Sequence, residues 1–343
     1  MRGVGTLLGI AALASLGLAQ QGSTGPYRVV KTAKVGGAGG YDYVYADANA
    51  RRLYIARSGR EPKMTVYNLD TFAPAGEIPT TNAHGAVVDS KSNHGFISSK
   101  PILMFDTKTL KPIKTIEVQG NPDGMLYDPA ERRVYVLSHI APHVTVINAK
   151  DGMVEGTIDL GGMPEEAASD GRGHLYVDIE DKANIAVVDT KTRMVTAHYD
   201  LTGKGGTCAG LALDAKNHIL FAACRNPANM VILSAEDGKI LTTLPIGMGT
   251  DGAEFNPKTM EAFSSQGDGT LTVIKEESPA SFTVEQTVQT MMGARTSTLD
   301  TKTNRIILIG AEFGPPTPPA RPGGRAGRGQ IVPDSFTILA VGK

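Results

Sequence analysis

Short apolar runs alternate with clusters of turn-forming residues along most of the chain. One pattern recurs: an Asp or Asn, a few polar residues, and then three or so residues rich in Tyr, Val, Ile, Leu or Phe. The seven copies start at Asp47, Asp89, Asp128, Asp170, Asp214, Asn256 and Asp300. Successive starts are 42, 39, 42, 44, 42 and 44 residues apart. This period is typical of a four-stranded propeller blade, so the pattern predicts an all-β, seven-bladed β-propeller.

Each copy also predicts its own strands. The polar residues after the Asp, as in 128–133, are typical of a hairpin turn between a first and a second strand. A third strand ends in another Asp or Asn, as in 144–148, and a fourth alternates apolar and polar residues, as in 156–160. Because such alternation indicates half-buried antiparallel strands, we expect four-stranded antiparallel blades.

The N-terminal segment 27–35 is similar to a fourth strand but has no blade before it. We expect it to be the outermost strand of the last blade, whose inner strands come from 294–310 and whose third strand comes from 336–339. Closing the ring in this way would remove exposed strand edges.

The first residues predict export. Arg2 is followed by an apolar run over 4–18 and by the small residue Ala19, which together are typical of a cleaved signal peptide over 1–19. The run is short for a membrane span, although a retained anchor stays open as an alternative. We therefore expect a secreted or periplasmic protein in which residues 20–343 form one propeller domain. We expect that domain to be monomeric, with no membrane insertion after signal cleavage.

The overall composition is that of a soluble globular protein. The 343 residues are 41% hydrophobic and 20% charged, with a formal net charge of -1, which gives no indication of a nucleic-acid partner. One segment differs: residues 313–333 are rich in Pro, Gly and Arg and interrupt the last blade. We interpret this insertion as a flexible loop on the binding face, where its arginines either contact an anionic partner or are simply solvated.

The repeat from 121–124 to 161–162 resembles the YVTN-type bacterial propellers, which are also described as lactonase-like or surface-layer propellers. The best-matching stretches are 128–136 and 187–190, and the resemblance covers nearly all of the chain after the signal peptide. It implies a seven-bladed propeller that binds a ligand or partner, or that acts on lactone-like substrates.

The candidate site lies on the face where the loops entering the first strands meet around the central channel. The residues five positions before the seven repeat starts are Asp42, His84, Asp123, Glu165, Ala209, Asp251 and Arg295. They predict a polar, mostly acidic funnel that binds a divalent cation or a cationic or sugar-like ligand. The alternative is that these residues cap turns at a solvated channel mouth.

The loops after the second strands face the same way and add Arg57, His139 and Arg225 as ligand-binding candidates. For one divalent cation in the channel mouth, the candidate ligands are His84, His139, His143 and Asp123. The alternative for these histidines is ordinary solvated surface positions. No other cofactor is predicted.

The two cysteines, Cys208 and Cys224, lie at equal distances from Lys216 in a predicted hairpin. They should therefore face each other on neighbouring strands and form a disulfide. Two free thiols, or soft ligands beside the funnel, remain the alternatives.

Two functions stay open at this point. The first is an extracytoplasmic module that binds an unknown protein or small-molecule ligand through the funnel face. The second is a metal-assisted hydrolase or lyase acting on lactone-like or sugar-derived substrates, which would need a bound ion.

Overall fold

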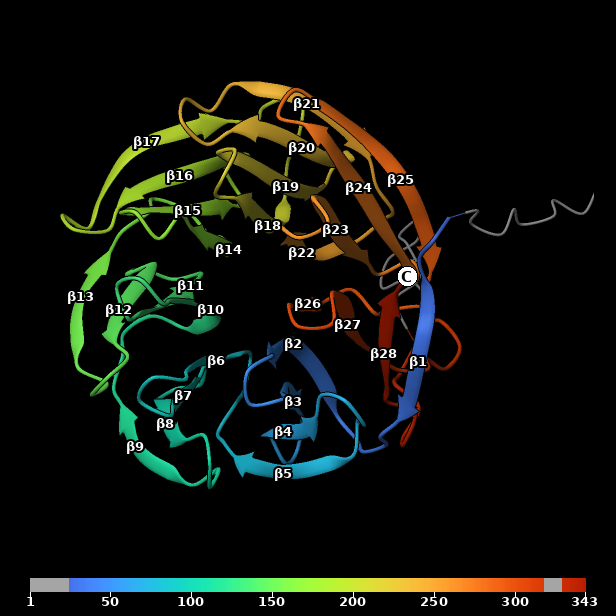
Figure 1. The fold of residues 1–343 in the computed structure, drawn as a ribbon. Coiled ribbons are helices and arrows are strands. Elements are labelled where there is room, and N and C mark those ends of the chain that lie inside the picture. Colours follow the sequence, from blue (N-terminus) through green and yellow to red (C-terminus); the bar gives the residue numbers. More distant parts are fainter. Residues whose placement is uncertain (1–24, 318–328) are drawn as a thin grey trace, which may run out of the picture.

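The computed structural model describes residues 25–317 and 329–343, which form seven four-stranded antiparallel sheets arranged as a ring (Figure 1). The prediction of a seven-bladed, all-β propeller is confirmed. No helix in the described part of the chain is long and apolar enough to cross a membrane. The predicted signal peptide and the middle of the insertion, 318–328, lie outside the described residues.

Each blade takes its four strands in order from the channel outwards. Blade 1 consists of β2 (Gly40–Asp47), β3 (Arg52–Ser58), β4 (Lys63–Asn68) and β5 (Pro74–Pro79). Blade 2 consists of β6 (Ala86–Asp89), β7 (His94–Ile97), β8 (Ile102–Asp106) and β9 (Pro112–Ile116). Blade 3 consists of β10 (Pro122–Asp128), β11 (Arg133–Ser138), β12 (Val144–Asn148) and β13 (Val154–Ile158). Blade 4 consists of β14 (Pro164–Ser169), β15 (His174–Ile179), β16 (Asn184–Asp189) and β17 (Met194–Asp200).

The remaining blades follow the same order. Blade 5 consists of β18 (Cys208–Asp214), β19 (Ile219–Arg225), β20 (Ala228–Ser234) and β21 (Ile240–Pro245). Blade 6 consists of β22 (Thr250–Asn256), β23 (Glu261–Gln266), β24 (Thr270–Ser278) and β25 (Ser281–Gln289). Blade 7 consists of β26 (Ser297–Asp300), β27 (Arg305–Gly310), β28 (Thr337–Gly342) and β1 (Arg28–Lys34).

The recurring Asp or Asn ends the first strand of six blades, follows it directly in blade 4, and shapes the turn that comes next. In all seven copies its Oδ1 accepts a hydrogen bond from the backbone N–H two residues later, at 2.7–3.2 Å. A short acceptor side chain at this position offers the backbone a turn in place of a continued ladder. This local bond explains why the pattern repeats through the sequence.

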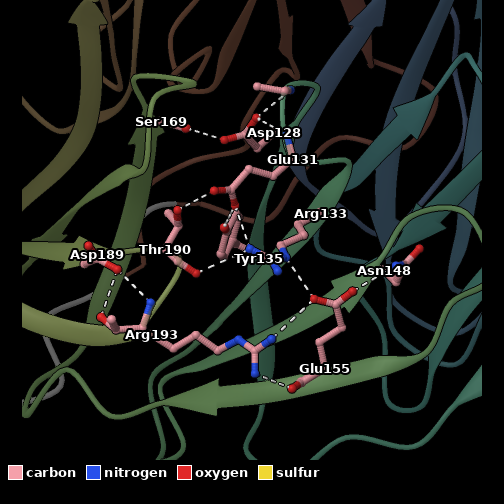
Figure 2. A network of polar contacts seen from close by, with 12 residues as sticks. Asp128, Glu131, Arg133, Tyr135, Asn148, Glu155, Ser169, Asp189, Thr190 and Arg193 are labelled. Atoms are coloured by element: carbon pink, nitrogen blue, oxygen red, sulfur yellow. Dashed lines mark hydrogen bonds and ion pairs between the residues drawn. The ribbon is translucent and has the colours of Figure 1, made fainter.

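Among the described residues, the core consists of seven apolar clusters, one at each interface between neighbouring blades. The interface between blades 3 and 4 also carries a polar network, shown in Figure 2. There Glu131 accepts hydrogen bonds from Arg133 at 3.0 Å and from Thr190 of the next blade. Arg133 Nε in turn donates to Glu155 Oε2 at 2.8 Å, and Arg193 donates to the Glu155 backbone oxygen at 2.6 Å. The blades are therefore joined by apolar packing inside and, here, by charge pairs nearer the surface.

The ring closes as predicted, because β1 pairs with β28 in blade 7. Figure 1 shows the two strands side by side, one blue and one red. Tyr27, just before β1, is fixed by the buried amide of Gln286 on blade 6. The Tyr27 N–H donates to Gln286 Oε1 at 2.9 Å, and Gln286 Nε2 donates to the Tyr27 oxygen at 2.7 Å. The N-terminal strand is thus bound to both blades that it adjoins.

The predicted Cys208–Cys224 disulfide is present. The hairpin register pairs Asp214 with Ile219, which by itself would leave the two cysteines one residue out of step. A β-bulge between Cys208 and Leu211 adds one residue to β18 and brings Cys208 opposite Cys224.

Candidate functional site

The residues of the predicted funnel ring sit at irregularities in the innermost strands. In five blades the pairing between the first two strands shifts register near the start of the first strand. The predicted funnel residue of each of these blades lies inside that bulge. These ring positions are Asp42, Asp123, Glu165, Ala209 and Asp251. Because a bulge turns a side chain away from the normal alternation, it accounts for the turn of these residues toward the channel mouth.

The other two ring residues, His84 and Arg295, precede the short inner strands β6 and β26. Hydrogen bonds to the backbone hold His84 in place on both sides. Its N–H donates to the Ser98 oxygen at 2.9 Å, and its oxygen accepts from the N–H of Tyr43 at 3.0 Å.

On one side of the mouth, two histidines alternate with three carboxylates. His84 Nδ1 lies 2.8 Å from Asp42 Oδ2 and 3.2 Å from Asp123 Oδ1. His139 Nε2 lies 3.4 Å from Asp123 Oδ2 and 3.0 Å from Glu165 Oε2. Asp123 therefore connects the two imidazoles.

On the other side, two arginines converge on one buried carboxylate. Arg225 pairs with Asp251 through Nη2, and Arg295 Nε lies 2.9 Å from the other oxygen of Asp251. Arg225 also lies 3.7 Å from Glu165 and 3.3 Å from Glu180. Together with the histidine side, this makes a chain of alternating acids and bases, to which all seven blades contribute. We call it the mouth ring: Asp42, His84, Asp123, His139, Glu165, Arg225, Asp251 and Arg295.

Charge within the mouth ring shifts several protonation equilibria. Hydrogen bonds to Asp123 and Asp42 raise the pKa of His84 to about 10, and the bond to Glu165 raises the pKa of His139 to about 9. Burial raises the pKa of Asp251 to about 6, because it outweighs the attraction of the two arginines. In the absence of a metal, both histidines are therefore cationic at neutral pH.

Two groups of side chains in the mouth ring have the donor set for a cation. They are Asp42 with His84 and Asp123, and Asp123 with His139 and Glu165, and within each group the ligand atoms lie within 4.8 Å of one another. One imidazole with two carboxylates suits borderline divalent ions. A bound ion would have to displace a proton from the histidine, since the ligating form is neutral.

Two candidates from the sequence lie apart from the mouth ring. His143 Nδ1 is bonded to the exposed Asp159 at 2.6 Å, so the structure does not bring it to the other candidate metal ligands. Arg57 is buried, with its guanidinium 3.5 Å from the centre of the Phe336 ring, and it donates to the backbone oxygens of Gly36 and Ala38. Arg57 thus stabilises the loop between β1 and β2.

Sequence reasoning missed the residues just below the mouth ring. One position further along each inner strand lie Tyr43, Gly85, Gly124, Glu166, Gly210, Gly252 and Thr296. Four of the seven are glycines, so the large Tyr43 and the acidic Glu166 stand out. The position four residues before each repeat start is glycine in most blades, and this alignment predicts Tyr43 and Glu166 as channel residues.

No family model matches the chain, and no curated protein matches its sequence. Solved structures do match its fold. The structure of the RRP9 WD40 repeats aligns with a TM-score of 0.72 at 10% identity, covering 93% of this chain and 100% of that one. The structure of U3-55K gives 0.71 at 10% identity, with 92% and 98% covered, and a chain of the mitotic checkpoint complex gives 0.70 at 12% identity, with 90% and 95% covered. These likenesses show a seven-bladed propeller with WD40-repeat neighbours, and the resemblance to YVTN-type propellers stays a prediction.

Proposed function

We propose that this chain is an extracytoplasmic binding module that recognises a polar small molecule through the mouth ring. The observation that carries the proposal is the ring itself: charged side chains from all seven blades meet at one point around the channel. Pairs that only join neighbouring blades occur elsewhere, as between Glu131 and Thr190, without converging on the channel.

The distribution of charge within the ring favours an anionic, hydroxylated ligand such as a sugar acid. Arg295 contacts Asp251 through Nε and its side chain is 39% exposed, so the guanidinium is also accessible to a ligand carboxylate. Asp123 and Glu165, across the mouth, are acceptors for hydroxyl groups. A ligand that spans both sides would satisfy both sets.

Calorimetric titration tests this proposal. D-galacturonate should bind at least about tenfold more tightly than neutral D-galactose, as expected for one charge-assisted hydrogen-bonded pair. Arg295→Gln should remove that preference, whereas Lys182→Gln, on an exposed loop outside the ring, should retain it. Equal binding of the acid by wild type and Arg295→Gln would contradict the proposal.

Export is part of the same proposal. The disulfide between Cys208 and Cys224 is compatible with an oxidising compartment. N-terminal sequencing of the protein from a secreting host should begin shortly after Ala19, and a full-length cytoplasmic product would refute export.

A second candidate, a metal-assisted hydrolase or lyase, is favoured by the two three-residue groups that share Asp123. A divalent cation held there would polarise a carbonyl oxygen or acidify a bound water. If one group holds the cation, the histidine of the other group, which keeps a carboxylate of its own in Asp42 or Glu165, would be available to donate a proton to a leaving group.

Equilibrium dialysis against Zn²⁺ or Mn²⁺ tests this candidate. We expect stoichiometric binding that Asp123→Asn abolishes and that Glu277→Gln, an exposed carboxyl on blade 6, leaves intact. Folded protein that takes up no ion would exclude the metal-assisted reaction and leave the binding module.

A further inference from the structure

A cavity lies in the channel beneath the mouth ring. It has a volume of about 550 Å³ and begins at Tyr43 and Glu165. At its other end it is lined by residues that are exposed on the opposite face of the propeller, namely Asn49, Ser90, Pro129 and Thr301. The cavity, which we call the inner channel, is therefore entered from the face opposite the mouth ring.

Tyr43 separates the inner channel from the mouth ring. Its side chain starts on blade 1, and its hydroxyl donates to the Glu165 backbone oxygen on blade 4, at 3.3 Å. On the way it passes Gly85 and Gly124, where an added Cβ would lie 3.5 Å from Tyr43 atoms. The glycines of blades 2 and 3 thus give the tyrosine room to cross the channel.

The inner channel holds carboxyl groups that have no cation beside them. Glu166 and Glu254 both line it. Glu166 accepts a hydrogen bond from the Leu211 N–H at 2.9 Å, whereas no hydrogen bond or ion pair joins Glu254 to another described residue. Behind this lining, the fully buried Asp178 accepts the Glu166 N–H at 2.6 Å, and its Oδ2 has no hydrogen-bond partner.

Burial dominates the titration of Glu254 and raises its pKa to about 8. No ion pair connects Glu166 or Glu254 with a Lys, Arg or His of the described chain. A cation entering the channel would supply the missing countercharge and draw a proton off the carboxyl that it meets.

The walls indicate which kind of cation fits. The described acids here do not form a group of metal ligands, because both such groups lie in the mouth ring. The lining between the acids and the entrance includes the aromatic and aliphatic residues Tyr45, Tyr127, Phe255 and Leu126, beside the polar Asp47 and Thr298. Aromatic faces attract organic cations, and a cavity of this size suits a small organic molecule.

We propose that the inner channel binds an organic ammonium ion with an apolar body, which enters from the face opposite the mouth ring and places its nitrogen between Glu166 and Glu254. This site goes beyond the proposed function at the mouth ring. The two sites are separated by Tyr43, so either can fail without the other.

Calorimetric titration with 2-phenylethylamine, and with the neutral 2-phenylethanol as its counterpart, tests the proposal. The amine should bind and the alcohol should bind at least about tenfold more weakly, since only the amine forms a charge-assisted pair. Titrations at pH 7 in buffers of different ionisation heat should show release of a proton on binding. No heat from the amine at millimolar concentration, or equal affinity for amine and alcohol, would overturn the proposal.

Variants then locate the site. Glu254→Gln should weaken the amine at least about tenfold and abolish the proton release, while Glu277→Gln, on the same blade but exposed, should match wild type. Ser90→Trp should block the entrance, whereas Asn121→Trp, on the mouth-ring face, should not. If Glu254→Gln does not fold, as judged by circular dichroism, the Ser90 and Asn121 pair decides. Amine binding that persists in the Ser90→Trp variant refutes the assignment. Amine binding that persists in a folded Glu254→Gln variant refutes it as well.

Discussion

We predict that the ionised side chain of Asp251 lowers the free energy of unfolding. A residue with this effect contributes to binding rather than to stability. The Asp251 side chain is only 8% exposed and contacts two arginines. Burial nevertheless raises its pKa from 3.8 to about 6. At about 1.36 kcal/mol per pKa unit, the ionised form costs the folded state about 3 kcal/mol.

The sign of the pH dependence follows from the raised pKa. Below about pH 4 the carboxyl is protonated in the folded and the unfolded chain and has no net effect. As pH rises from about 4 to 6, the unfolded chain ionises more readily, so this group lowers stability by up to about 3 kcal/mol. Above pH 6 the loss stays constant.

Asp251→Asn removes this cost but also removes a partner from each arginine. Arg225 retains Glu180 at 3.3 Å and Glu165 at 3.7 Å, and Arg295 is 39% exposed to water. The loss should therefore be smaller than for a fully buried pair. We expect the variant to be up to about 3 kcal/mol more stable than wild type at pH 7.

Urea unfolding at pH 4, 5, 6 and 7 measures the effect, with the exposed Glu117→Gln as control. The gain of Asp251→Asn should grow from pH 4 to pH 7, and the control should show no such trend. A variant that is more than about 1 kcal/mol less stable at pH 7 would show that Asp251 clamps the arginines for stability, and the reasoning from burial would be wrong.

Three further outcomes follow from other contacts. Asp89 is fully buried and bonded to a guanidinium, which lowers its pKa to about 2, so Asp89→Asn should cost about 2 kcal/mol above pH 4 and progressively less as pH falls toward 2, in urea titrations. Replacing Cys208 and Cys224 by Ser should cost about 3 kcal/mol for the 15-residue loop, and thermal melts should show the same loss when wild type is reduced. The imidazole signals of His84 and His139 should not titrate between pH 5 and 8 in metal-free protein, and an NMR midpoint near 6.5 for either would refute the ion pairs drawn for it.

The architecture was readable from the sequence because its cause is local. Each repeat start makes a bond to the N–H two residues later, so Asp47 and its six counterparts mark the blades without long-range information. Segment 27–35 could be assigned to the last blade because only one blade lacked an outer strand.

The candidate site was only partly readable, since it depends on contacts between blades. Aligning the repeats identified the mouth-ring position, but which partners meet follows from bulges that shift single residues, as at Asp42 and Asp123. His139 and His143 looked equivalent in sequence. The structure turns one to Glu165 and the other to Asp159, and nothing in their spacing distinguishes them.

The pairing of β1 with β28 also affects how the chain folds during its synthesis. Because β1 pairs with β28, the ring cannot close until β28 has been synthesised. A chain that stops before β28 would leave β1 unpaired. The exposed strand edges could then pair with other chains. Closure of the ring therefore depends on β28 being present, and a chain that lacks it would expose strand edges in blade 7.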